Sequence, residues 1–215
     1  MTVDTAEPLH LAVVSAGLSV PSSTRLLADR LTESVRKQLA DAGREVEIHT
    51  VELRDLAADI ANNLVTGFPS LTLAEAIETV TSADGLIAVT PVFSASYSGL
   101  FKSFFDVIDN DTLTGKAVLA AATGGTARHS LALDHALRPL FAYLRAVVVP
   151  TAVYAASEDW GGNGDPLTDT LPNRIVRAAG ELAGLMRERT GAAARTADDT
   201  SVVPFAQQLD ALRPA

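Results

Sequence analysis

Serine and threonine side chains crowd a short segment near the N-terminus. Residues 15–24 read Ser-Ala-Gly-Leu-Ser-Val-Pro-Ser-Ser-Thr, and Ser19, Ser22, Ser23 and Thr24 contribute hydroxyls just where a helix is expected to begin. Hydroxyls and free backbone N–H groups at a helix start favour binding of an anion such as a phosphate monoester. The segment lacks the G-x-G-x-x-G, GKS and GKT patterns of nucleotide loops, which favours a single terminal phosphate. Ordinary helix capping would use the same residue types, so the sequence leaves both interpretations open.

A second segment combines turn residues with aromatic residues. Residues 90–106 read Thr-Pro-Val-Phe-Ser-Ala-Ser-Tyr-Ser-Gly-Leu-Phe-Lys-Ser-Phe-Phe-Asp. Pro91 and Gly99 indicate a stiff turn ahead of a helix, and Phe93 supplies a ring close to that turn. Such a turn could face a flat ligand with its backbone. A plain turn followed by aromatic core residues fits the pattern equally well.

A third segment is rich in glycine. Residues 122–129 read Ala-Thr-Gly-Gly-Thr-Ala-Arg-His. Gly124 and Gly125 allow a ligand to approach the backbone closely, and nearby N–H groups could meet the oxygens of a heterocycle. His129 could donate a hydrogen bond to that ligand or cap the next helix.

Strand and helix patterns alternate around these three segments. Short apolar runs predict strands, and apolar residues repeated every three or four positions predict helices. The predicted strands are 9–15, 45–53, 85–89, 116–122 and 146–153, the last interrupted by Pro150. The predicted helices are 22–42, 71–82, 99–108, 130–144 and 172–190, with Pro139 kinking or restarting the fourth. Residues 54–70 are expected to form a short helix and a loop, and 90–98, 123–129 and 157–171 are expected to be loops.

Five strands that alternate with helices predict an α/β fold, a doubly wound parallel sheet with helices on both faces. Ligands of such sheets bind beyond the carboxyl ends of the strands, where the strand order reverses. The three segments above follow the first, third and fourth predicted strands. We therefore expect them to meet in one site.

Composition excludes several classes of protein. The chain has 215 residues, 47% of them hydrophobic, with 26 acidic against 17 basic residues and a formal charge of −9. This acidic balance argues against a nucleic-acid or anionic-membrane partner, and no apolar run is long enough to span a bilayer. The absence of cysteine excludes thiol chemistry, and the four histidines lack metal-ligand spacing, so no metal site is expected. The N-terminus lacks a signal-peptide pattern, and we expect a cytoplasmic protein.

Two of the segments resemble a known family. TPVFSASYSGLFKSFFD is similar to the TPxYxxxYSGxxKxxxD signature of NAD(P)H-dependent FMN reductases, which have the flavodoxin-like fold. ATGGTARHSLALDHALRPL resembles the ATGGTxxHxLAxDxALxP stretch of the alkanesulfonate FMN reductases, and the PSST sequence resembles their phosphate loop. The resemblance spans residues 9–153. Phe93 stands where the family usually has tyrosine, so a phenol contact does not carry over.

The resemblance implies FMN and NADPH or NADH as cofactors. It places Ser15, Ser22, Ser23 and Thr24 around the FMN phosphate; Pro91, Val92, Phe93, Ser98 and Gly99 along the flavin ring; and Thr123, Gly124, Gly125 and His129 at its pyrimidine side. The flavin would carry the chemistry of hydride transfer at N5, so no catalytic acid, base or nucleophile is expected. The 2′-phosphate of NADPH could meet Arg25, Arg128 or Arg145.

Three activities compete at such a site. The resemblance favours an FMN reductase that supplies reduced FMN to a flavin-dependent monooxygenase. A quinone or azo-dye reductase that retains FMN is the first alternative. An electron-transfer flavodoxin is the second, and its acidic surface would match the charge, but the segments around the ring lack tryptophan and offer one tyrosine.

The domain expectation is one flavodoxin-like domain over 1–190 and a tail over 191–215 that docks on its own or a partner subunit. The helix after the second segment has apolar side chains on more than one stripe: Leu100, Phe101, Phe104 and Phe105, preceded by Tyr97. A helix that is apolar around most of its girth must be buried on two sides. We therefore expect a homodimer or homotetramer, although cover by residues 54–70 of the same chain would also bury it.

Overall fold

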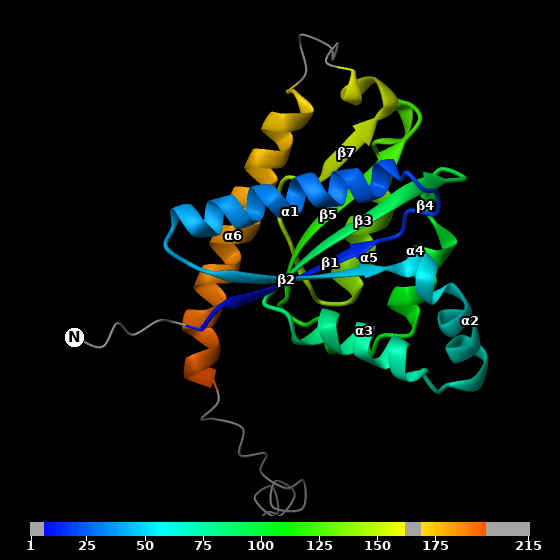
Figure 1. Ribbon diagram of the computed structural model, residues 1–215, viewed down its shortest axis with the longest axis horizontal. Coiled ribbons are helices and arrows are strands. Elements are labelled where there is room, and N and C mark those ends of the chain that lie inside the picture. Colours follow the sequence, from blue (N-terminus) through cyan, green and yellow to red (C-terminus); the bar gives the residue numbers. More distant parts are fainter. Residues whose placement is uncertain (1–6, 162–168, 197–215) are drawn as a thin grey trace, which may run out of the picture.

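A central parallel sheet organises the computed structural model, which describes residues 7–161 and 169–196 (Figure 1). The strand order is β2-β1-β3-β5-β6. The main strands are β1 (Leu9–Ser15), β2 (Val46–Glu52), β3 (Gly85–Phe93) and β5 (Ala117–Gly124). The fifth position holds two short strands, β6 (Val147–Val148) and β7 (Val153–Ala156), which both pair with β5. The order is that of the flavodoxin-like fold, and the predicted doubly wound sheet is confirmed.

Two helices cover one face of the sheet. They are α1 (Ser23–Asp41) and α6 (Leu171–Thr196), which lie against each other. Leu27, Leu31 and Val35 of α1 are fully buried, in one core cluster with alternate residues of β1. This spacing of apolar residues explains why the segment is an amphipathic helix. Helix α6 continues to Thr196, beyond the predicted end at Thr190, so the first residues of the predicted 191–215 tail are helical, and its remaining residues, 197–215, lie outside the described part of the chain.

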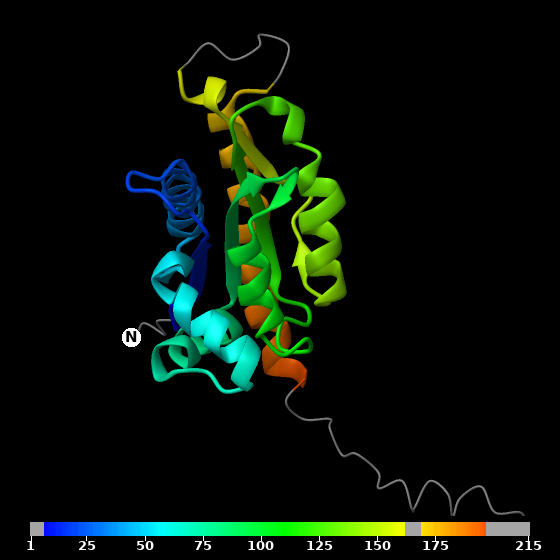
Figure 2. The same cartoon turned by 90° about the vertical axis from the view of Figure 1, so that its right-hand side faces the viewer.

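The opposite face is covered by shorter elements (Figure 2). They are η1 (Leu53–Leu56), α2 (Ala57–Thr66), α3 (Leu71–Ser82), α4 (Gly99–Asp106), the π-helical turn η3 (Leu133–Leu137) and α5 (Arg138–Tyr143). The short helix and loop predicted over 54–70 are confirmed: α2 ends at Thr66, and the left-handed Gly67, whose φ is 77°, begins the loop. Helix α4 ends at Asp106, two residues earlier than predicted.

Proline shapes the second half of the chain as expected at two positions. Pro139 lies in the first turn of α5, where a missing N–H is tolerated, and the segment predicted as one helix over 130–144 is divided at that point. Pro150 lies between β6 and β7. The amide of Thr151 donates to the Glu181 carboxylate of α6 at 2.7 Å instead of joining the sheet.

The segment after β3 differs from its prediction. Residues 90–98 were expected to be a loop, yet β3 continues to Phe93 and turns back into β4 (Ser96–Tyr97). Val92 pairs with Tyr97 and Phe93 with Ser96 in an antiparallel hairpin. Because Ser94 and Ala95 have φ of 49° and 68°, the turn adopts the twist of a tight hairpin without glycine. Without a glycine at the turn, the local sequence does not indicate the hairpin.

Across residues 7–161 and 169–196, no helix combines the length and the apolar character that crossing a membrane requires.

Candidate active site

The three predicted segments meet at the carboxyl end of the sheet. Figure 1 shows the start of α1 and the β4 hairpin at the same end of the molecule. Between them lies a cleft of about 320 Å³. It is lined by the serine-rich loop (Leu18, Ser19, Ser22, Ser23, Thr24), the hairpin strand (Pro91, Val92, Phe93), the glycine-rich loop (Thr123, Gly124, Gly125) and Ser157.

The serine-rich loop is shaped by the start of α1. Ser22 is the N-cap, and its Oγ accepts from the backbone N–H of Arg25 at 3.2 Å. The first helical bond runs from Leu26 N to Ser22 O, so the amides of Ser23 and Thr24 precede the helical ladder. Those two N–H groups, the positive end of a 19-residue helix and the exposed Ser23 hydroxyl make a neutral anion site.

Gly17 allows this loop to close. A Cβ at position 17 would lie 2.1 Å from Ser22 Oγ and 3.1 Å from its Cβ. This close contact explains why position 17 is a glycine, although its φ is not in the positive range that usually requires one. The Ser22 side chain therefore packs directly against the backbone of Gly17.

A buried pair of hydroxyls joins two of the loops. Thr24 Oγ1 and Thr123 Oγ1 are 2.8 Å apart, and both residues are almost completely buried. Either oxygen can donate to the other, and the hydroxyl that accepts keeps its own hydrogen available for a further bond. The Thr24 hydroxyl, predicted to face a phosphate, is thus bonded to the glycine-rich loop, and its backbone N–H is a further donor at the helix start.

Tyr154 supports the glycine-rich loop from β7. Its hydroxyl donates to the carbonyl of Thr126 at 2.8 Å. A Cβ on Gly124 would lie 2.0 Å from the same hydroxyl oxygen, so only glycine fits between the loop and the ring. Burial, followed by the nearby charges of Glu158 and Asp159, raises the pKa of Tyr154 above its usual value of 10.0. The phenol therefore remains a hydrogen-bond donor in neutral solution.

The hairpin presents one aromatic face to the cleft. Phe93 is 48% exposed, whereas Phe101, Phe104 and Phe105 of α4 are buried. A half-exposed ring at the end of a buried strand is available for stacking on a planar ligand. Two successive non-glycine residues with positive φ hold the ring at this edge, a conformation that costs energy and is often found at functional sites.

Four predicted residues lie outside this cleft lining. Ser15 is fully buried at the end of β1, and its Oγ has no hydrogen-bond partner among the described residues. Ser98 is the N-cap of α4, its Oγ accepting from Phe101 N at 3.2 Å, and Gly99 begins that helix. His129 lines a neighbouring hollow with Arg128 and His135.

Three cleft residues were not among the predicted site residues: Leu18, Ser19 and Ser157. Leu18 and Ser19 belong to the serine-rich loop; the Ser19 hydroxyl was noted in the sequence, but only Ser15, Ser22, Ser23 and Thr24 of this segment were predicted as site residues. Ser157 directly follows β7, so the rule that ligands bind at the carboxyl ends of strands could have identified it.

The cleft lining has no charged side chain. Arg25, at the start of α1, is turned toward carboxylates: its Nη1 lies 2.5 Å from Glu52 and its Nε 2.7 Å from Asp29. These hydrogen bonds, that of Glu52 first, raise the pKa of Arg25 above its ordinary value. Arg145 pairs with Asp111 at 2.9 Å. Of the three arginines considered for NADPH, only Arg128 lines a hollow beside the site.

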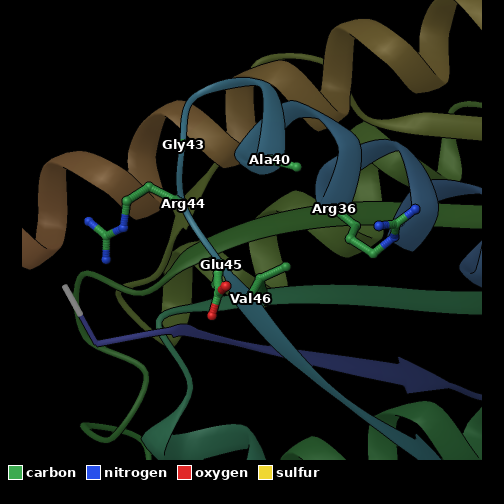
Figure 3. Close-up of a pocket in the computed structure, with 6 residues that line it drawn as sticks. All are labelled: Arg36, Ala40, Gly43, Arg44, Glu45 and Val46. Carbon is green, nitrogen blue, oxygen red and sulfur yellow. The ribbon is translucent and has the colours of Figure 1, made fainter. Parts of the chain in front are cut away.

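A larger hollow of about 530 Å³ lies elsewhere, between the end of α1 and the start of β2. Figure 3 shows Arg36 and Arg44 on opposite sides of it and directed apart. Arg36 is bound to Glu33 through two hydrogen bonds, and Arg44 donates to the carbonyl of Glu7 at 3.1 Å. Because its cations already have partners and do not converge, this hollow is less suited to a ligand than the smaller cleft.

Comparison with known proteins gives consistent results. The sequence model of the family described as NADPH-dependent FMN reductase matches residues 9–161, which include every residue of the cleft lining. The FMN reductase (NADPH) of Pseudomonas aeruginosa is 37% identical over 85% of this chain and 95% of its own length. The NADH-dependent FMN reductase SfnF of Pseudomonas putida is 37% identical over 70% of this chain and 78% of its own.

A solved structure shows the same architecture. An oxidoreductase from Corynebacterium diphtheriae is 49% identical and superimposes with a TM-score of 0.80. The match covers 85% of this chain and 99% of the other. The similarity therefore extends over the sheet, its helices and the three loops of the cleft.

Proposed function

Because this chain belongs to the NADPH-dependent FMN reductase family and is an NAD(P)H-dependent FMN oxidoreductase, we propose that it releases reduced FMN to a separate flavin-dependent monooxygenase. The observation that supports release is the openness of the cleft walls. Leu18 is 53% exposed and Phe93 48% exposed, on opposite flanks of the site. A flavin held there would keep much of its ring accessible. The sequence resemblance to alkanesulfonate FMN reductases supports the same role.

The cleft fits the chemistry of FMN. A phosphate brings its own negative charge, and the helix start offers it neutral donors from Ser22, Ser23 and two free amides. The buried Ser15 Oγ, which has no partner among the described residues, adds one polar group at this end of β1. A Cβ at Gly125 would meet no atom within 4 Å, so the glycine-rich loop leaves open space where the flavin ring would lie. These residues would hold FMN without a basic side chain.

The residues of the chain contribute to the reaction by holding the reactants in place. FMN, when bound, supplies the ring that accepts a hydride from the nicotinamide. Phe93 offers its ring as a platform beside Pro91 and Val92, and the glycine-rich loop provides backbone N–H groups. The Thr24–Thr123 bond fixes the distance between the phosphate end and the ring end of the site. Orientation of the two reactants is then the main contribution of the protein to the rate.

A dialysis and transfer experiment tests the release of reduced FMN. The purified enzyme is loaded with FMN, dialysed, and examined by its visible flavin absorbance. We expect the flavin to be lost, and a flavin-dependent monooxygenase to turn over when it is mixed with this reductase, NADPH and catalytic FMN. Flavin retained at one equivalent, efficient quinone or azo-dye reduction and an inactive monooxygenase would instead establish the alternative reductase.

Comparing flavins tests the proposed phosphate site separately. FMN carries a terminal phosphate that riboflavin lacks. We expect riboflavin to have the highest KM among FMN, FAD and riboflavin in steady-state assays with each nicotinamide. Equal KM values for FMN and riboflavin would contradict the assignment of the serine-rich loop.

We further propose that the enzyme is a homodimer or homotetramer, although α4 is covered within its own chain. Phe101, Phe104 and Phe105 are buried within the same chain, where α4 contacts α2 and η1. One group of exposed apolar residues lies instead around the turn from α2 to α3: Leu64, Val65, Phe68 and Leu71. An apolar group of this kind is typical of an interface. Light scattering decides the matter, because a mass near 22.5 kDa would indicate a monomer.

A further inference from the structure

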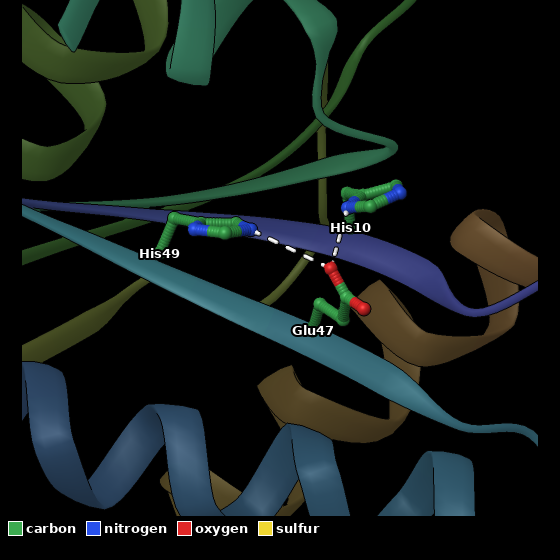
Figure 4. A group of neighbouring side chains, drawn as sticks. All are labelled: His10, Glu47 and His49. Carbon is green, nitrogen blue, oxygen red and sulfur yellow. Dashed lines mark ion pairs between the residues drawn. The ribbon is translucent and has the colours of Figure 1, made fainter.

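Three potential metal ligands lie together on β1 and β2, at the amino end of the sheet. His10 is the second residue of β1, and Glu47 and His49 are the second and fourth residues of β2. The parallel register places His10 opposite Glu47, and the small Ala12 opposite His49. Side chains two residues apart on a strand share a face. Figure 4 shows the two imidazole rings with the Glu47 carboxylate reaching both.

The distances are close to those of a coordinated ion. Glu47 Oε2 lies 3.6 Å from His10 Nδ1 and 3.9 Å from His49 Nε2, and one ligand atom from each residue falls within 4.8 Å of the other two. Ligands bound tetrahedrally at about 2.0–2.1 Å from zinc are separated by about 3.3 Å. Small side-chain rotations, with no change in the sheet, would bring the three atoms to that separation.

The donor set selects a class of metal. Two imidazoles and one carboxylate suit Zn²⁺ and its neighbours Co²⁺, Ni²⁺ and Cu²⁺, whereas Mg²⁺ and Ca²⁺ require mainly oxygen ligands. The side chains of His10, Glu47 and His49 are 48%, 57% and 52% exposed, which leaves room for water as a fourth ligand. Asp84 accepts from the backbone N–H of His10 at 2.8 Å and adds a negative charge nearby.

We propose that His10, Glu47 and His49 form a binding site for a divalent transition metal, with zinc as the representative ion. The site links the edge strand β2 to β1 through side chains as well as through the sheet. The ligands show no metal-ligand spacing along the chain because His10 lies 37 positions before Glu47, and only the pairing of β1 with β2 brings them together. The site is independent of the proposed delivery of reduced FMN. From His10 to Ser15 the strand rises about 17 Å, which separates the two sites.

Calorimetric titration of the metal-free full chain with Zn²⁺, in a buffer that does not chelate metals, tests the site. We expect one equivalent to bind, and the affinity to fall at least tenfold in His49→Ala and in Glu47→Gln. His135→Ala and Glu45→Gln are the matched controls, since each removes the same chemical group outside the cluster, and both should bind zinc like the unaltered protein. Excess Mg²⁺ should not displace the zinc.

A second measurement covers variants that fold poorly. Co²⁺ bound by the unaltered protein should show the visible absorption of a cobalt ion with nitrogen and oxygen ligands, and addition of Zn²⁺ should abolish it. FMN reduction should remain unchanged in Glu47→Gln. Absence of saturable zinc binding, or binding of equal strength in Glu47→Gln, His49→Ala and the controls, would overturn the proposal. In either case the two contacts of Glu47, with His10 and with His49, would be only surface interactions.

Discussion

The two ends of the sheet stabilise their polar groups in opposite ways. At the carboxyl end, Ser15, Thr24 and Thr123 are buried and uncharged, and two of them bond to each other. At the amino end, His10, Glu47 and His49 are half exposed and ionisable. Buried hydroxyls need partners to offset the loss of water, whereas exposed ion pairs contribute about 0–1 kcal/mol.

This difference indicates which end has been shaped for a ligand. Neutral donors held in fixed positions are already organised for a molecule that brings its own charge. The loops that hold them have little freedom to adjust, because Gly17 and Gly124 each leave no space for a Cβ. Substitutions at the carboxyl end should therefore have large effects on flavin binding, and those at the amino end small ones.

The largest effect is expected from Gly124→Ala. The added methyl group would overlap the Tyr154 hydroxyl, 2.0 Å away, and displace it from Thr126. Overpacking of this kind costs about 1–3 kcal/mol of unfolding free energy. The FMN Kd should rise about tenfold or more, because the displaced loop lines the cleft. Denaturant titration and flavin fluorescence measure the two effects. Gly184→Ala, where a Cβ meets no atom within 4 Å, should show neither.

The double variant Ser22→Ala plus Ser23→Ala tests the phosphate donors. Loss of two hydrogen bonds to a charged group should weaken FMN binding by about 1–3 kcal/mol. Ser22 is also a helix cap, so Ser70→Ala is the control for lost capping: its Oγ accepts from Leu73 N at 3.2 Å, the distance found for Ser22, at the start of α3. Unchanged FMN affinity in a folded double variant would exclude the serine-rich loop as the phosphate site.

A smaller and selective effect is expected from Arg128→Ala. Arg128 lies on the glycine-rich loop side of the site, whereas Arg25 and Arg145 are paired with carboxylates. If Arg128 meets the 2′-phosphate, the KM for NADPH should rise severalfold while that for NADH stays constant. Arg145→Ala serves as the control. A parallel change in both KM values would assign Arg128 a role other than phosphate recognition.

The smallest expected effect is the pH dependence of the unfolding free energy that Tyr154 causes. Its raised pKa means that the folded state favours the neutral phenol. The resulting stability is fully present below the unfolded pKa of about 10 and is lost as the pH rises through the higher folded value. Unfolding free energies from pH 9 upward should therefore fall more steeply for the unaltered protein than for Tyr154→Phe. At neutral pH the same variant should lose about 1 kcal/mol, the usual net worth of one hydrogen bond.

The sequence was sufficient where the local pattern determines the structure. Ser22 as a helix cap, Pro139 at a helix start and Pro150 as a strand interruption all follow from the chemistry of one residue. The convergence of Ser22, Pro91 and Gly124 follows from the general rule for parallel sheets. The place of Ser98 could not be predicted in this way, because the hairpin turn before it has positive φ at Ser94 and Ala95 and contains no glycine to indicate it.

Pairing between distant strands was also beyond the sequence. Thr24 and Thr123 are 99 positions apart, and their hydrogen bond depends on how α1 packs across β5. His10 and Glu47 meet only through the register of β1 and β2. Tyr154 was predicted to lie just past a strand, yet it belongs to β7, whose start is delayed by Pro150. Such contacts require the packed fold, which no local pattern contains.

The division of the fifth strand into β6 and β7 affects how two copies of this protein can associate through the edge of the sheet. An uninterrupted edge strand offers a row of free N–H and C=O groups on which another chain can extend the sheet, a common route to aggregation. Here Pro150 removes one N–H, and the Glu181 carboxylate takes the amide of Thr151. Only the short runs of β6 and β7 lie along this edge. The interruption thus protects this edge of the sheet against edge-to-edge growth with a second copy of the chain.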